Sequence, residues 1–221
     1  MHVFYLHGFA SSGQSSKAAF FAGKLATHAV RLHAPDLNLP DFSTLTISRM
    51  VTQVGAAIEA TGEGAVALIG SSLGGFVAVQ AALKHPRVQR LVLLAPALDF
   101  GGNRMANLGD RGIEEWRATN RLDVFHYGYG RVVPVHYELY EDANRHDSYN
   151  AALAIPVQVF QGRRDTAVDP ETVERWSRAR PNVELHMLDD DHQLLGSLDY
   201  LWKEMERFFF KLPATSYQQM P

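Results

Sequence analysis

The sequence predicts an α/β fold with a mainly parallel sheet and helices on both of its faces. Short apolar runs alternate with amphipathic segments along almost the whole chain, and six of the runs have the character of buried strands. The 221 residues, of which 46% are hydrophobic and 20% charged, suffice for one full core. We therefore expect a single domain over residues 1–221.

The predicted elements follow one another in a regular order. In one helix, over residues 44–60, apolar side chains recur at i, i+3 and i+4 and define a single buried face. Another helix ends before Pro86, because proline disfavours helix in the preceding residue. The strands are expected at 3–6, 30–34, 65–69, 90–94, 157–160 and 183–188, and the helices at 15–29, 44–60, 76–84, 169–179 and 197–210. The polar tail from Pro213 is expected to be frayed.

One interval, residues 97–150, breaks this alternation between the fourth and fifth strands. It is too long for a simple connection in a compact domain and suggests an inserted lid or cap. Within it, 122–127 and 132–137 flank Gly128-Tyr129-Gly130, a pattern typical of a β-hairpin.

The stretch Gly70-Ser71-Ser72-Leu73-Gly74 lies between a predicted strand and a predicted helix. It fits G-x-S-x-G with Ser72 in the middle, whereas Ser71 has a leucine two positions on. A serine on such a sharp turn needs small neighbours on either side, so Ser72 is a candidate nucleophile. The alternative is an ordinary glycine-serine turn.

A serine nucleophile needs a base, and the base needs a group that orients it. Asp165 follows the fifth strand and His192 follows the sixth, so Ser72, Asp165 and His192 occur in the order of an α/β-hydrolase triad. Taken singly, Asp165 could begin a turn and His192 could be a surface residue. Asp169 is more plausible as a helix cap, and Asp189 lies too close to His192 in sequence.

Other polar clusters favour structural readings. Residues 189–192, Asp-Asp-Asp-His, suggest metal binding, but consecutive residues rarely direct their side chains to one point, so we expect no metal. Three evenly spaced histidines of the insertion could bracket a pocket, but their spacing is interpreted as chance; they are His126, His136 and His146. Four arginines of the insertion could meet an acidic substrate, but a solvated face is preferred; they are Arg104, Arg111, Arg117 and Arg121. Phe208-Phe209-Phe210 is expected to be a core face with one partly exposed ring.

The opening FYLHGFASSGQSSKA, together with IGSSLGGF, resembles the α/β-hydrolase superfamily and within it the small bacterial YqiA-like esterases. The resemblance implies that the backbone N–H groups of Phe9 and Leu73 form an oxyanion hole and that His7 is structural. The resemblance also implies that the first strand of this sequence corresponds to the one that normally comes third, so we expect a sheet without the superfamily's usual first two strands.

We therefore expect a serine hydrolase that cleaves a small-molecule carboxylic ester without a cofactor. A thioesterase or amidase would use the same groups, a lyase or C–C bond cleaving enzyme could keep them, and a non-catalytic binding protein ranks last. Aromatic residues of the insertion are expected to wall the substrate pocket, with Trp116, Phe125, Tyr127 and Tyr129 as the candidates.

Composition excludes other classes. A net charge of -3 argues against a nucleic-acid partner, and the absence of cysteine excludes disulfides and thiol catalysis. The start MHVFYLHGF is not typical of a secretory leader, and no run is long enough to span a membrane. We expect a cytoplasmic monomer or homodimer.

Overall fold

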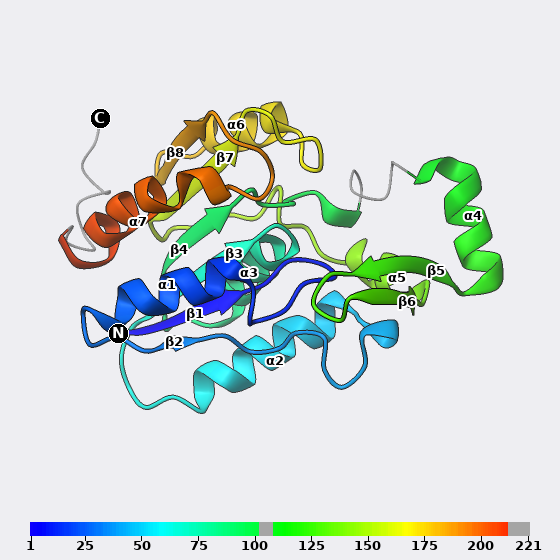
Figure 1. Ribbon diagram of the computed structural model, residues 1–221, viewed down its shortest axis with the longest axis horizontal. Coiled ribbons are helices and arrows are strands. Elements are labelled where there is room, and N and C mark those ends of the chain that lie inside the picture. Colours follow the sequence, from blue (N-terminus) through cyan, green and yellow to red (C-terminus); the bar gives the residue numbers. More distant parts are fainter. Residues whose placement is uncertain (102–107, 212–221) are drawn as a thin grey trace.

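The computed structural model describes residues 1–101 and 108–211, which are arranged around a central six-stranded sheet (Figure 1). The strand order is β2-β1-β3-β4-β7-β8, and every neighbouring pair is parallel. The prediction of six mainly parallel strands is therefore confirmed. The strands are β1 (His2–Leu6), β2 (Leu32–His33), β3 (Val66–Ser71), β4 (Val88–Leu94), β7 (Val157–Gly162) and β8 (Val183–Leu188).

Helices cover both faces of this sheet (Figure 1). In β1, Val3 and Tyr5 point into the core shared with α1 and α7, while Phe4 and Leu6 point into the core shared with α2, α3 and α6. Strands buried on both faces read as continuous apolar runs, which is why the sequence revealed them. The helices are α1 (Ser16–Ala26), α2 (Ile47–Glu59), α3 (Leu73–Lys84), α6 (Pro170–Arg178) and α7 (Leu198–Glu206).

The boundaries differ from the expected ones in a few places. Strand β2 pairs through only two residues, because it lies at the sheet edge and Pro35, which has no N–H, follows closely. Helix α3 begins at Leu73, directly after Ser72. Beyond α7 the chain continues as a π-helix, Arg207–Lys211, in which Phe208 and Phe209 are buried and Phe210 is 37% exposed, as expected.

The insertion, residues 97–150, contains the predicted hairpin as β5 (Leu122–His126) and antiparallel β6 (Arg131–Val135). It also contains two helices that the sequence did not predict, α4 (Gly109–Thr119) and α5 (Glu138–Ala143). In Figure 1 these elements lie together beside the body of the sheet. Arg104 and the tail from Pro213 lie outside the described residues. Within the described ranges, no helix is both long and apolar enough to cross a bilayer.

Candidate active site

Ser72 occupies the sharp turn between β3 and α3. Its backbone has φ 54° and ψ -117°, a left-handed conformation that costs energy for any residue other than glycine. The turn is held by hydrogen bonds from Ser72 N to Leu94 O at 2.9 Å, and to Ser72 O from the amides of Gly75 and Ala97. The predicted strand–turn–helix context of a nucleophilic serine is therefore present.

Steric crowding requires glycine at positions 70 and 74, on either side of Ser72. A Cβ on Gly74 would lie 2.0 Å from the carbonyl oxygen of Leu6, at the end of β1. A Cβ on Gly70 would lie 2.4 Å from the carbonyl oxygen of Gly74. Both distances are far below contact, so any larger residue would push β1 or α3 away from the serine turn.

Ser71, the other candidate, faces the core instead. It is the last residue of β3, is 4% exposed, and hydrogen-bonds through its side chain to the buried hydroxyl of Tyr5. Ser72 is partly exposed. The environments of the two adjacent hydroxyls therefore favour Ser72 as the reactive one.

The loop after β1 packs directly against Ser72. A Cβ on Gly8 would lie 3.2 Å from Ser72 Cβ and 3.9 Å from its Oγ. His7 is buried and accepts a hydrogen bond at Nε2 from the amide of Leu37, which leaves Nδ1 to donate to the Gly8 carbonyl at 3.0 Å. Because both nitrogens of His7 are engaged in shaping the loop, its position agrees with the structural role that the family resemblance implies.

Asp165 and His192 meet through a hydrogen bond of 2.8 Å between Asp165 Oδ2 and His192 Nδ1. Asp165 Oδ1 accepts from the amides of Ala167 and Val168, so the carboxylate is held on both sides. With Nδ1 engaged, Nε2 is the nitrogen of His192 left to act on a serine. Ser72 follows β3, Asp165 follows β7 and His192 follows β8, so all three leave the same edge of the parallel sheet.

Two contacts around Asp165 were not evident in the sequence. Gln161 Nε2 donates to its carboxylate at 2.9 Å. Gly162 lets the two loops touch, because a Cβ there would lie 2.5 Å from the carbonyl oxygens of both Asp190 and Asp191. Burial alone would raise the pKa of Asp165, but the contact with His192 and the donors from Val168 and Gln161 outweigh it and lower that pKa. Asp165 is therefore held as a carboxylate.

The rival acids serve other purposes. Asp169 caps α6 by accepting from the amides of Glu171 and Thr172. Asp189 is highly exposed and pairs with Arg164 on the surface. Asp190 instead accepts from the hydroxyl of Ser197. The run of aspartates before His192 therefore points in several directions.

The insertion docks on the loop that follows β1 and on the 3-10 turn Phe42–Thr44. The amide of Tyr127 donates to the Ala10 carbonyl at 2.8 Å, and His136 N donates to Ser43 O at 2.8 Å. The buried His126 packs edge-on against Phe42 with ring centroids 4.5 Å apart. These contacts bring the insertion next to the Gly8 loop, which itself touches Ser72.

The four aromatic candidates in the insertion have two environments. Trp116, on α4, is 1% exposed and donates from Nε1 to the Val135 carbonyl, so it holds the insertion together. Phe125, Tyr127 and Tyr129 belong to the hairpin and are 49%, 78% and 43% exposed.

The histidines and arginines of the insertion have separate neighbours. His146 lies 3.7 Å from the carboxylate of Asp142 and hydrogen-bonds to Ser48 of α2. These partners are different from those of His126. Arg117 donates to the hydroxyl of Tyr137, and Arg121 pairs with Asp123.

Sequence comparison identifies the family. Residues 2–209 match the model of the Uncharacterised protein family (UPF0227). The chain belongs to UPF0227. A lipase from Mycobacterium tuberculosis, LipV, is 35% identical to this UPF0227 chain over 94 residues, which cover 39% of this chain and 36% of that protein. The chain therefore matches only about a third of the length of this curated relative.

Solved structures with the same fold are α/β-hydrolases. A putative hydrolase from Agrobacterium vitis S4 has a TM-score of 0.81 at 22% identity, covering 93% of this chain and 86% of its own. Est1E from Butyrivibrio proteoclasticus, with ferulic acid bound, has a TM-score of 0.81 at 18% identity, covering 95% and 88%. The mouse α/β hydrolase domain-containing protein 10 has a TM-score of 0.79 at 19% identity, covering 96% and 90%. The α/β-hydrolase fold predicted for this chain is thus confirmed, as is the resemblance found in the sequence.

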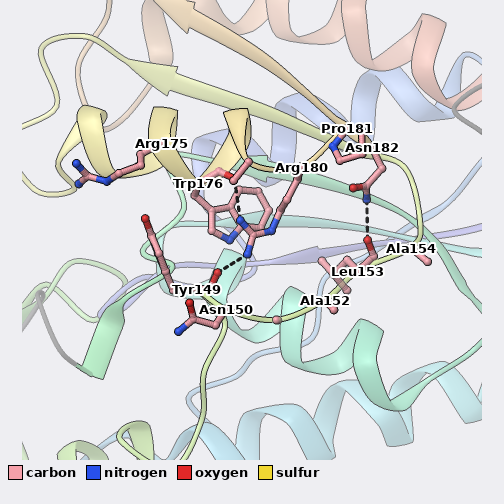
Figure 2. Close-up of a pocket in the computed structure, with 12 residues that line it drawn as sticks. Tyr149, Asn150, Ala152, Leu153, Ala154, Arg175, Trp176, Arg180, Pro181 and Asn182 are labelled. Carbon is pink, nitrogen blue, oxygen red and sulfur yellow. Dashed lines mark hydrogen bonds between the residues drawn. The ribbon is translucent and has the colours of Figure 1, made fainter. Parts of the chain in front are cut away.

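Figure 2 shows a cavity of this UPF0227 chain with a volume of about 690 Å³, whose lining does not include Ser72. It is lined by the segment before β7 and by α6 with the turn before β8, so it sits at the amino ends of these strands. Arg180 stacks on Trp176 and donates to the carbonyl oxygens of Trp176 and Tyr149. These bonds tie α6 to the preceding segment, which is a structural role.

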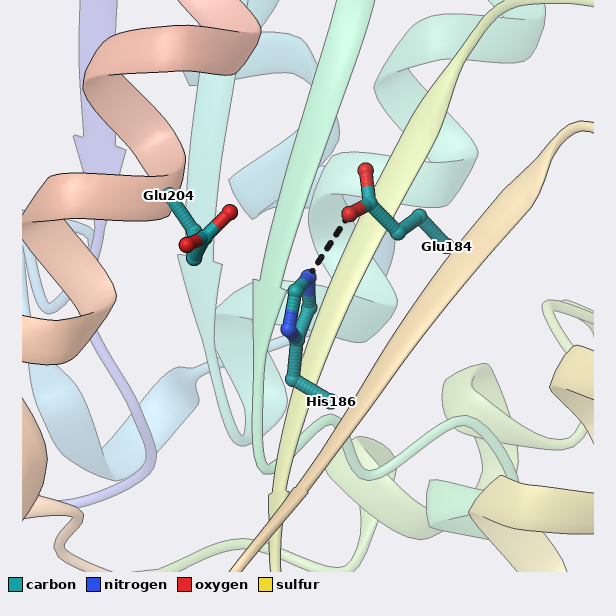
Figure 3. A group of neighbouring side chains, drawn as sticks. All are labelled: Glu184, His186 and Glu204. Atoms are coloured by element: carbon teal, nitrogen blue, oxygen red, sulfur yellow. Dashed lines mark ion pairs between the residues drawn. The ribbon is translucent and has the colours of Figure 1, made fainter.

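A second cluster, Glu184, His186 and Glu204, lies between β8 and α7 (Figure 3). Its ligand-type atoms lie within 4.8 Å of one another, close enough for a metal ion. However, Arg207 already pairs with Glu184 at 3.0 Å and with Glu204 at 2.9 Å, and His186 pairs with Glu184 at 3.1 Å. The guanidinium of Arg207 supplies the positive charge that a metal ion would bring, so we interpret the cluster as an ion-pair network.

Proposed function

We propose that this chain is a serine hydrolase that cleaves carboxylic esters through an acyl-enzyme. Ser72 is the nucleophile, His192 the general base and Asp165 the carboxylate that orients it. The observation that carries the proposal is the strained Ser72 turn at the sheet edge from which the hydrogen-bonded Asp165–His192 pair also extends. The lipase relative and the α/β-hydrolase neighbours support the same class of enzyme.

In the first half-reaction, Ser72 Oγ attacks the ester carbonyl carbon while His192 Nε2 takes the serine proton. The tetrahedral oxyanion is stabilised by the backbone N–H groups of Phe9 and Leu73. Leu73 is the first residue of α3, so its N–H has no partner within the helix, which supports its proposed role as a donor to the oxyanion. Each such donor is worth about 3 kcal/mol in transition-state stabilisation.

The intermediate then collapses, and His192 returns the proton to the leaving alcohol. Water deprotonated by His192 attacks the acyl-enzyme and releases the acid and free Ser72. Asp165 accepts from Nδ1 throughout, which fixes the tautomer and stabilises the imidazolium. The reaction needs no cofactor or metal.

The insertion is proposed to act as a lid that selects the substrate. Its hairpin contacts the loop next to Ser72, and its exposed rings, Phe125, Tyr127 and Tyr129, offer apolar surface for an acyl or alcohol group. Trp116 would act through the packing of the hairpin on α4. The enzyme is further proposed to work on small molecules, as a cytoplasmic monomer or homodimer.

Product analysis on matched substrates tests this function. The enzyme is offered p-nitrophenyl esters of increasing chain length, the corresponding thioesters and the corresponding anilides. We expect ester cleavage with one equivalent of acid released per alcohol. Faster turnover of the thioesters or anilides would reassign the scissile bond. No turnover of any substrate would contradict the proposal.

A further inference from the structure

Lys17 is a buried cation beside the proposed catalytic pair. It lies in the first turn of α1 and is 7% exposed, although lysine is rarely buried without a partner. Phe21 and Leu25 follow at intervals of four on the same buried stripe, so an apolar residue at position 17 would continue the helix–sheet packing. Packing alone therefore does not account for a lysine here.

The ammonium group of Lys17 is directed at the loop that carries His192. Lys17 Nζ donates to the carbonyl oxygen of Gln193 at 3.0 Å. On the other side of the histidine, the amide of Arg164 donates to the Asp190 carbonyl at 3.0 Å. His192 thus lies between one residue anchored to α1 and another anchored to the loop of Asp165.

The charges around Lys17 are all carboxylates of this site. Asp165, Asp190 and Asp191 face it from the loops after β7 and β8, and each favours its charged form. Burial opposes them and is the larger effect, so the pKa of Lys17 is lowered to about 8. The lysine is therefore charged at neutral pH and becomes neutral in mildly alkaline solution.

From these contacts we infer that Lys17 is a positioning residue, which holds the loop 190–194 so that His192 stays against Asp165. The inference rests on the proposed function of the same site. The cation acts through the loop and does not touch the substrate. It also balances the three carboxylates that would otherwise repel one another around the histidine.

The test compares Lys17→Met, Lys17→Arg and the control Lys24→Met in the full chain. Lys24 lies on the same helix but pairs at the surface with Asp199. The readouts are kcat and KM on the best ester, the rate at which a fluorophosphonate labels Ser72, and activity between pH 6 and 10. Thermal unfolding is followed for every variant.

We expect Lys17→Met to fold and to lose about 10- to 100-fold in kcat and in labelling rate, with KM nearly unchanged. Lys17→Arg should recover most of the activity at neutral pH. The parent should lose activity above about pH 8, where Lys17 becomes neutral, and Lys17→Arg should not. Lys24→Met should match the parent.

Equal kcat in the parent and in a folded Lys17→Met would overturn the inference. If Lys17→Met does not fold, Lys17→Arg decides. An alkaline activity loss that is the same in the parent and in Lys17→Arg would then count against Lys17. A parent that is inactive on all esters and resists labelling contradicts the proposed function itself, and this inference falls with it.

Discussion

The carboxyl edge of the sheet and the insertion at residues 97–150 are built in different ways. At the sheet edge, Ser72 and the Asp165–His192 pair are fixed by backbone approaches that only Gly74 and Gly162 permit. The insertion keeps one ring, Trp116, in its own core and leaves three rings of its hairpin exposed. Under the proposed function, catalysis depends on rigid strand ends, and substrate selection depends on exposed side chains of the insertion.

The largest effect is expected from the two adjacent serines. Ser72→Ala should lose about four to six orders of magnitude in turnover, as triad nucleophiles do. Ser71→Ala removes a hydroxyl that bonds to the buried Tyr5 and should remain measurably active. Turnover is measured on the best ester with both variants folded. Near-normal turnover in Ser72→Ala would place the nucleophile elsewhere.

The second prediction concerns Lys17 at the sheet edge, whose burial makes the free energy of unfolding depend on pH. The pKa of Lys17 is about 8 in the folded chain against 10.5 for an ordinary lysine, so between these pH values the folded state binds fewer protons than the unfolded state. The free energy of unfolding of the parent, relative to that of Lys17→Met, should therefore rise by up to about 3 kcal/mol from pH 7 to 11. Urea unfolding of both proteins across this range measures it. Parallel pH curves would contradict the burial of a charged lysine.

A third prediction tests whether the loops of Asp165 and His192 must approach each other closely at Gly162. Gly162→Ala should lower kcat about 100-fold, because the new Cβ pushes the His192 loop away from Asp165. Gly23→Ala is the matched control, since a Cβ there meets nothing within 4 Å, and in a helix it should add up to about 1 kcal/mol of stability. Full activity in a folded Gly162→Ala would show that the two loops need not touch.

The smallest effects are expected from the exposed rings of the insertion. Alanine at Phe125, Tyr127 or Tyr129 should leave turnover of the shortest ester nearly unchanged. At least one of them should shift the relative kcat/KM along a chain-length series by about 1–3 kcal/mol. Trp116→Ala should disturb the same profile only together with a loss of stability, since this ring is buried. An unaltered profile in all three folded hairpin variants would assign selectivity to the core loops instead.

Much of the sheet edge could be predicted from the sequence, because each strand and the motif that follows it are recognised from residues that are neighbours in the chain. The strands before Ser72, Asp165 and His192 are apolar runs in the sequence. The parallel topology then places the carboxyl ends of these strands at the same edge of the sheet. The packing of the insertion could not be predicted. Helix α4 has only two large apolar side chains, Ile113 and Trp116, and the burial of Trp116 depends on the partner strand β6.

The contact of Lys17 with the His192 loop also could not be predicted from the sequence. The signal was present, because a lysine interrupts the buried stripe that Phe21 and Leu25 continue. What it contacts lies more than a hundred residues along the chain, at Gln193, and only the folded structure brings the two together. The contact of Gln161 with Asp165 was missed for a different reason, because a glutamine inside a buried strand reads as a break in the pattern.

We propose that Ser72 is a nucleophile activated by His192 and Asp165. Its most direct test is labelling of the parent with a fluorophosphonate, followed by digestion and mass spectrometry of the labelled peptide. We expect one phosphonyl group per chain, on Ser72, and at least a 1,000-fold slower reaction in His192→Gln, on the order expected when a triad base is removed. Label on Ser71, or labelling of Ser72 at the parent rate in His192→Gln, would contradict it.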